Sequence, residues 1–144
     1  MNKLTQRLIE SQATLFQLFF KTWTYHYNVK GSDFIQLHEL FGEQKDYIFT
    51  ELDRLSEHLR YLEITPAPTL TKVVENSQID EPTLVKAKEM VEHLLEDNEI
   101  FIELLLATSS EAEKENKTPT ENLLQEMAEN HGVFIYKLRS LLSE

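Results

Sequence analysis

The sequence predicts an all-α fold, a bundle of four long helices with a long crossover between the second and the third. Apolar residues recur at helical spacing in four stretches, and no stretch shows the alternation of a strand. Glycine and proline are scarce, at 3 and 4 of 144 residues, which favours long helices over turns. The length and a hydrophobic content of 41% suit one domain, residues 1–144, with its own core.

The first helix is expected over Leu4–Tyr27, with apolar side chains on two adjacent faces. A helix of this kind usually has one partner within the fold and a second outside it. Its aromatic stripe favours a core or subunit contact over a cofactor pocket and consists of Phe16, Phe20 and Trp23. Gly31 can take the left-handed conformation that ends a helix. Asp33, with Gln36 three residues later, resembles a capping box for the next helix.

The second helix is expected over Phe34–Leu62, and Gly42 inside it costs ~1 kcal/mol relative to alanine. A crossover of residues Glu63–Asp80 follows, with a short helical piece at Thr71–Asn76. A connection of this length can return along the whole bundle, so the second and third helices can run parallel.

The third helix is expected to begin at Asp80-Glu81-Pro82 and to fray near Glu115–Asn116. The fourth is expected to begin at Thr118-Pro119-Thr120-Glu121, which reads as a capping box with proline at the first helical position. His131 lies on the apolar stripe of this helix and is expected to be a hydrogen-bonded core histidine. The surroundings of His93 are expected to face solvent.

Composition narrows the functional classes. The formal net charge is −11, from 25 acidic and 14 basic residues, which repels a phosphate backbone. The expected helices leave no basic tail at either end, so DNA binding is not expected. The absence of cysteine excludes disulfides and thiolate metal sites. No apolar run is long enough to span a membrane or to act as a signal, so a cytoplasmic protein is expected.

Four residues of metal-binding types stand in or beside the second helix: His26, His38, Asp53 and Glu57. On one helix His38 and Asp53 lie about 22 Å apart, too far to close around one ion. On a helical wheel Asp53 and Glu57 lie about 130° and 170° from the centre of the apolar stripe, so both point away from the core. No histidine has a glutamate three residues before it, which disfavours a dimetal site inside one bundle. Either these residues form no site, or two copies of the helix pair antiparallel and build it together.

Three stretches carry a family resemblance: His26-Tyr27-Asn28-Val29-Lys30-Gly31, Phe34-x-x-Leu37-His38-Glu39-Leu40-Phe41 and Asp53-x-x-x-Glu57. At matching intervals they resemble the pattern of the Dps family of bacterial mini-ferritins, the DNA-binding proteins from starved cells. The resemblance covers nearly the whole chain. It implies a ferritin-like bundle that assembles from twofold dimers into a hollow dodecameric shell.

The resemblance also implies a ferroxidase site at each twofold interface. His26 and His38 would come from one subunit, and Asp53 and Glu57 from its neighbour, with Glu57 bridging or anchoring the iron. Such sites oxidise Fe(II), preferably with hydrogen peroxide, and store ferric mineral, which protects the cell from oxidative stress.

The chain departs from the family pattern at several positions. Tyr27 replaces the usual tryptophan and keeps an aromatic ring that could quench or relay oxidising equivalents. Gly42 stands where many members carry an acidic residue that supports a second iron, so that iron would bind weakly or through water. Ser56 and His58 replace the common residues around Glu57, and His58 is expected at the surface.

Other readings stay open. Glu121 is a candidate lining of an iron-conducting threefold pore, with helix capping as the alternative. A rival function is a non-enzymatic shell that protects DNA by coating it or acts as a structural or recognition particle. A third possibility is a four-helix protein that never assembles.

Overall fold

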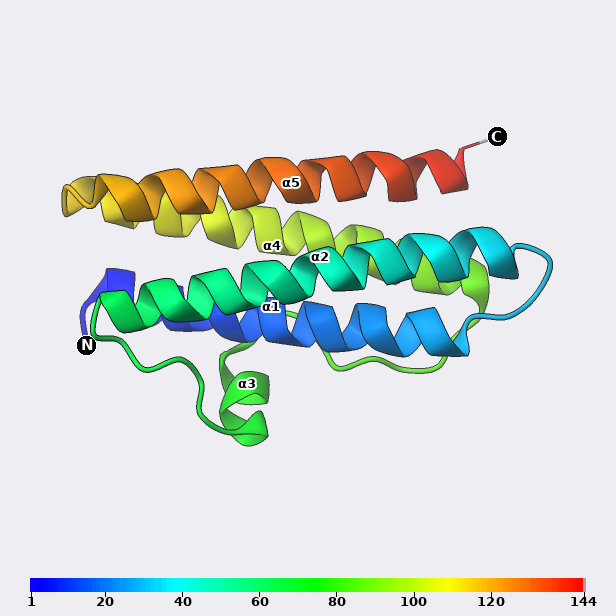
Figure 1. Cartoon of the computed structure of the whole chain (residues 1–144), viewed down its shortest axis with the longest axis horizontal. Coiled ribbons are helices and arrows are strands. Elements are labelled where there is room, and N and C mark those ends of the chain that lie inside the picture. Colours follow the sequence, from blue (N-terminus) through cyan, green and yellow to red (C-terminus); the bar gives the residue numbers. More distant parts are fainter. Residues whose placement is uncertain (144) are drawn as a thin grey trace.

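The computed structural model describes residues 1–143, which contain five helices and no strand. These are α1 (Lys3–Asn28), α2 (Phe34–Tyr61), α3 (Leu70–Asn76), α4 (Ala87–Lys114) and α5 (Thr118–Leu142). The four long helices lie side by side, and α1 with α2 and α4 with α5 form two antiparallel hairpins (Figure 1). The crossover that carries α3 runs back along the bundle, so α2 and α4 point the same way. The predicted bundle, its long crossover and the short helix within it are confirmed.

The apolar stripes of the four long helices meet in one continuous core. Its largest fully buried side chains include Tyr25, Phe41, Phe101, Leu8, Leu15, Ile48 and Leu55. None of the helices within residues 1–143 combines the length and apolar character needed to cross a membrane.

Both expected capping boxes are wrong. Gly31 takes a positive φ of 114°, as expected, but Asp33 makes no side-chain hydrogen bond to the start of α2. The backbone of Asp33, at φ −101° and ψ 20°, is not in the extended conformation that aims a capping side chain at the helix. At α5 the capping position is Lys117, because Thr118 is already helical, and no side chain caps this end. Pro119, expected at the first helical position, is the second residue of α5 and lies in its first turn.

The start of α4 was predicted too early, since the helix begins at Ala87 and not at Asp80. The preceding carbonyls are engaged by side chains of α1. The Nζ of Lys21 donates to the carbonyl of Asp80 at 3.1 Å, and the hydroxyl of Tyr25 donates to the carbonyl of Thr83 at 3.2 Å. Burial raises the pKa of Tyr25 to about 12, so this hydroxyl stays a donor. These tertiary contacts hold the segment extended against α1.

A buried polar network joins α2, α4 and α5. The Nδ1 of His131 lies 2.7 Å from the Oδ1 of Asn98, and its Nε2 lies 2.6 Å from the Oε1 of Glu51. All three side chains are buried. The expectation of a hydrogen-bonded core histidine is therefore confirmed, and Glu51 is its unforeseen partner.

Two other histidines are less exposed than expected. His93 is half-buried, and its Nδ1 lies 3.1 Å from the hydroxyl of Tyr25. His58 is also half-buried, with its Nε2 2.8 Å from the hydroxyl of Thr120, and burial lowers its pKa. Glu92 and Glu96 beside His93 are exposed, as expected. His93 and His58 themselves are only partly exposed, because neighbouring helices supply partners that a single-helix pattern does not show.

Candidate metal centre

The short connection between α1 and α2 brings His26 and His38 together. His26 lies in the last turn of α1 and His38 in the second turn of α2, and their rings stack with centroids 4.0 Å apart and an interplanar angle of 12°. The Nδ1 of His26 lies 2.6 Å from the carbonyl oxygen of His38. The Nδ1 of His38 lies 2.7 Å from the carbonyl oxygen of His26. The two residues thus orient each other reciprocally.

These bonds fix the tautomer of both rings. A carbonyl oxygen only accepts, so each Nδ1 carries the proton and donates it. In a neutral imidazole the Nε2 then holds a free lone pair, which is the form that binds a metal ion. Burial lowers the pKa of His26 and favours this neutral form. Neither Nε2 has a hydrogen-bond partner among residues 1–143.

Sequence reasoning singled out the two histidines but missed the two carbonyl groups that orient them. The only signal was the position of the histidines on either side of a short connection. That signal places them near each other without showing which ring nitrogen is free.

Aromatic side chains surround the histidine pair at the surface. Phe34 stacks on His38 with centroids 5.0 Å apart, and Tyr27 meets the edge of His26 at 4.7 Å. Trp23 continues this strip, and its ring centroid lies 5.3 Å from that of Tyr27. Tyr27 is 58% exposed, and Trp23 and Phe34 are each 40% exposed. Trp23 and Phe34 are therefore not core residues of this chain.

Asp53 and Glu57 lie on the outer face of α2, both exposed, as the helical wheel predicted. Neither side chain makes an ion pair or hydrogen bond with another part of residues 1–143, and the adjacent Arg54 pairs with Glu126 instead. Asp53 lines a hollow of about 200 Å³ together with Phe16 and other residues of α1 and α2. The two carboxylates thus lie one helical turn apart on the same exposed face, and Asp53 borders the hollow.

Residues 1–143 of one chain gather no group of three or more histidine and carboxylate side chains able to hold a metal ion. The chain brings His26 and His38 together and leaves Asp53 and Glu57 apart from them. It therefore offers two half-sites, one of imidazoles and one of carboxylates. The role of all four residues as ligands stays a prediction.

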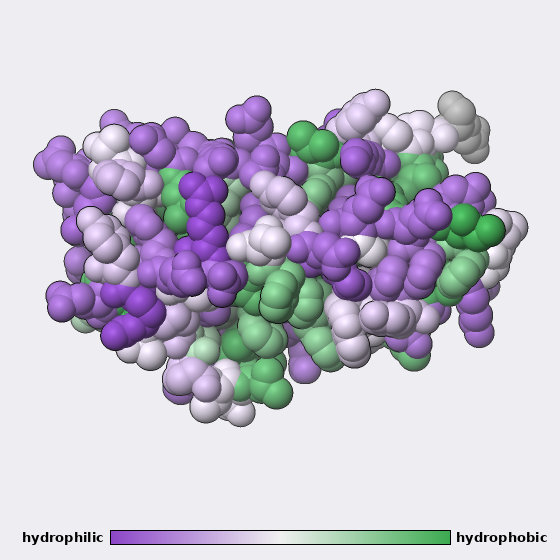
Figure 2. Space-filling view, viewed as in Figure 1, coloured by the Kyte–Doolittle hydropathy of each residue, from purple (hydrophilic) through white to green (hydrophobic). Residues whose placement is uncertain are grey.

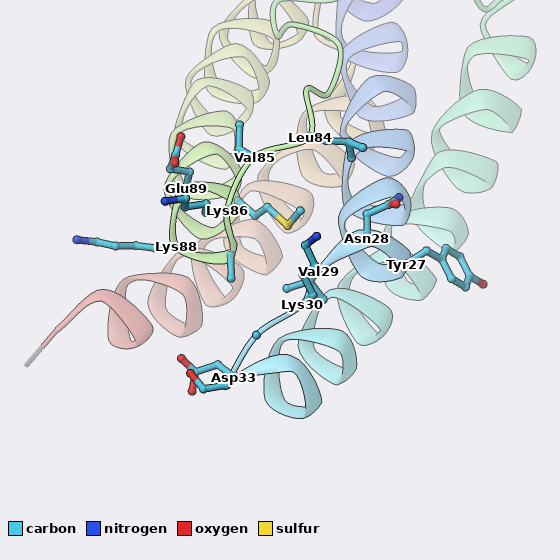
Figure 3. Close-up of a pocket in the computed structure, with 14 residues that line it drawn as sticks. Tyr27, Asn28, Val29, Lys30, Asp33, Leu84, Val85, Lys86, Lys88 and Glu89 are labelled. Carbon is cyan, nitrogen blue, oxygen red and sulfur yellow. The ribbon is translucent and has the colours of Figure 1, made fainter.

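A hollow of about 1170 Å³ lies between the α1–α2 connection and the segment that leads into α4 (Figure 3). Lys30, Lys86 and Lys88 outnumber Asp33 and Glu89 in its lining. In Figure 3 Lys30 points toward the hollow and Lys88 points away from it.

The chain is similar in sequence to a family model and to several curated proteins. Residues 5–144 match the family model described as Ferritin: Ferritin-like domain. The DNA protection during starvation protein of Helicobacter pylori is 30% identical over 111 residues, covering 76% of this chain and 77% of that protein. DNA protection during starvation protein 2 of Bacillus anthracis is 27% identical over 146 residues, covering the whole of both chains.

Solved structures agree on the fold. Dps from Staphylococcus aureus superimposes with a TM-score of 0.93 at 25% identity, covering 98% of this chain and 95% of that one. The Dps protein from Vibrio cholerae, described as a member of the ferritin-like diiron-carboxylate superfamily, gives 0.93 at 20% identity and covers 98% and 89%. The ferritin-like bundle expected from the sequence is confirmed.

The reciprocal hydrogen bonds predict that His26 and His38 both hold the proton on Nδ1 at neutral pH without metal. Free histidine prefers the proton on Nε2, so the two tautomers differ in their nitrogen chemical shifts. Solid-state NMR of the ¹⁵N-histidine-labelled protein measures this, with His26→Gln and His38→Gln variants to assign the signals. An Nε2–H tautomer at either residue would contradict the geometry described above.

Proposed function

This chain belongs to the Dps family of ferritin-like proteins, and from that premise we propose that it oxidises Fe(II) and stores the ferric product. The iron is substrate and cargo. The observation that carries the proposal is the histidine pair, in which the two rings stack and each donates a hydrogen bond from Nδ1, so that both Nε2 atoms stay free. Imidazole nitrogens combined with carboxylate oxygens form a donor set that suits iron.

The carboxylates come from a second copy of the chain in this proposal. Asp53 and Glu57 point outward without partners, and the histidines lie in an exposed aromatic strip that a second subunit would cover. Figure 2 shows apolar side chains gathered near α3 and the middle of α1 and α2 amid a mostly hydrophilic surface. Antiparallel pairing across a twofold axis then joins His26 and His38 of one chain to Asp53 and Glu57 of the other. Two sites result for each dimer, and six dimers close the dodecameric shell.

Hydrogen peroxide is the proposed oxidant. Two Fe(II) ions each give up one electron, and peroxide takes up these two electrons and two protons to become two molecules of water. Because the oxygen–oxygen bond is cleaved with both electrons supplied, no hydroxyl radical is released. This chemistry would consume iron and peroxide together and limit oxidative damage in the cytoplasm.

Replacing Asp53→Asn and Glu57→Gln together should slow peroxide-driven Fe(II) oxidation at least about tenfold, because even groups that only support metal ligands contribute ten- to hundredfold. The rate is followed anaerobically by the ferric absorbance after peroxide is added. The matched control is Glu99→Gln with Glu103→Gln, which removes two exposed carboxylates at the same spacing on α4. If the Asp53/Glu57 variant keeps the parental rate, the assignment of the carboxylates is wrong.

DNA protection by coating is the rival function, and the hollow of Figure 3 is the surface that favours it. Lys30, Lys86 and Lys88 line it and make no ion pair within residues 1–143. The net charge of −11 argues against DNA binding, because it repels the phosphate backbone over the whole molecule. We therefore expect no retardation of DNA by the purified protein in a gel at physiological salt and neutral pH. A clear shift that Lys86→Glu with Lys88→Glu abolishes would favour the rival.

A further inference from the structure

Gly42 lies in the interior of α2, one turn after His38, where glycine is a poor helix former. Its φ is not positive, so the backbone conformation does not require glycine. The space that a side chain would fill is occupied by His26 of α1. A Cβ atom added at residue 42 would lie 2.7 Å from the Cε1 of His26 and 3.0 Å from its Nδ1. The His26 ring therefore lies in the space that a side chain at residue 42 would fill.

The His26 ring has little freedom to yield. Its Nδ1 donates to the carbonyl of His38 at 2.6 Å, one face stacks on the ring of His38, and Tyr27 meets it at an angle of 72°. A ring pushed away from residue 42 moves its Nδ1, the atom that the hydrogen bond holds in place. When that bond is lost, nothing keeps the proton on Nδ1 and the lone pair on Nε2.

We propose that Gly42 is a positioning residue of the histidine half-site, because it leaves the space that lets His26 bond to His38 and present its Nε2 to the metal ion. The inference rests on the proposed function, since it concerns the same site. The same contact bears on an acidic metal-binding residue at position 42. In this chain the Cβ of an aspartate or glutamate at residue 42 would meet the His26 ring, just as that of alanine would.

The chain offers a matched control for testing this role. Gly132 lies inside α5, and a Cβ added there meets nothing within 4 Å. Both Gly42→Ala and Gly132→Ala improve helix propensity. Gly132→Ala should therefore unfold at or above the parental temperature, and Gly42→Ala should do so only if the His26 ring gives up its hydrogen bond to His38 and moves aside. Only Gly42→Ala should weaken metal binding.

Isothermal titration of the purified, assembled protein with Co²⁺, a stand-in for Fe(II) that is stable in air, measures this difference. The variant with Asp53→Asn and Glu57→Gln defines binding outside the site. Gly42→Ala should lower the affinity at least about tenfold, the loss typical of removing a group that orients a metal-binding histidine. Gly42→Asp should bind no additional ion and should also lose affinity, whereas Gly132→Ala should match the parent.

A double variant shows whether Gly42 acts through His26. In a His26→Ala background the ring is absent, so adding Gly42→Ala should cause no further loss of Co²⁺ affinity. If Gly42→Ala alone lowers the unfolding temperature, His26→Ala should restore it by removing the atom that clashes. Parental Co²⁺ affinity in Gly42→Ala, or equal losses with and without His26, overturns the positioning role. Parental binding that does not change in His26→Ala would instead contradict the metal site itself, and with it the proposed function.

Discussion

Two hydrogen bonds between α1 and α2 set the chemistry of this molecule, each running from a histidine Nδ1 to the carbonyl of the other histidine. They hold His26 and His38 as one stacked unit and leave both Nε2 atoms available. The rest of the site follows from this constraint. The His26 ring must lie against Gly42, and the aromatic side chains of Tyr27 and Phe34 close around the pair. The hairpin that builds half of the bundle thus also builds the histidine half of the proposed metal site.

Helix α2 has a different task on each of its two faces. Its inner face carries Glu51, which pairs with His131 across the bundle in a fully buried network. Its outer face carries Asp53 and Glu57, exposed and without partners among residues 1–143. A buried ion pair or hydrogen-bonded pair adds little net stability, but a misplaced partner leaves a buried polar group unsatisfied. The inner pair therefore favours one rotation of α2, and that rotation directs the two carboxylates outward.

The sequence was sufficient to predict the bundle, because four long apolar stripes and a long crossover leave few other architectures. It also placed Asp53 and Glu57 correctly on the outer face of α2, since a helical wheel needs only the period of one helix. Prediction from the sequence failed where contacts between different helices and segments determine the structure. The start of α4 was predicted too early because Lys21 and Tyr25 bind the carbonyls of the preceding segment. The contact between Gly42 and His26 joins two helices, so no single-helix pattern contains it.

The central claim is that each site is shared between two chains, and complementation tests it most directly. One chain carries His26→Ala with His38→Ala, and the other carries Asp53→Asn with Glu57→Gln. The two are co-expressed with different affinity tags and purified as mixed assemblies. Each mixed dimer then has one site with all four ligands and one with none, so random pairing restores about a quarter of all sites. The account predicts that mixed assemblies recover about this share of the parental rate of Fe(II) oxidation by peroxide, while each variant alone stays inactive. Mixed assemblies as inactive as the separate variants would contradict it.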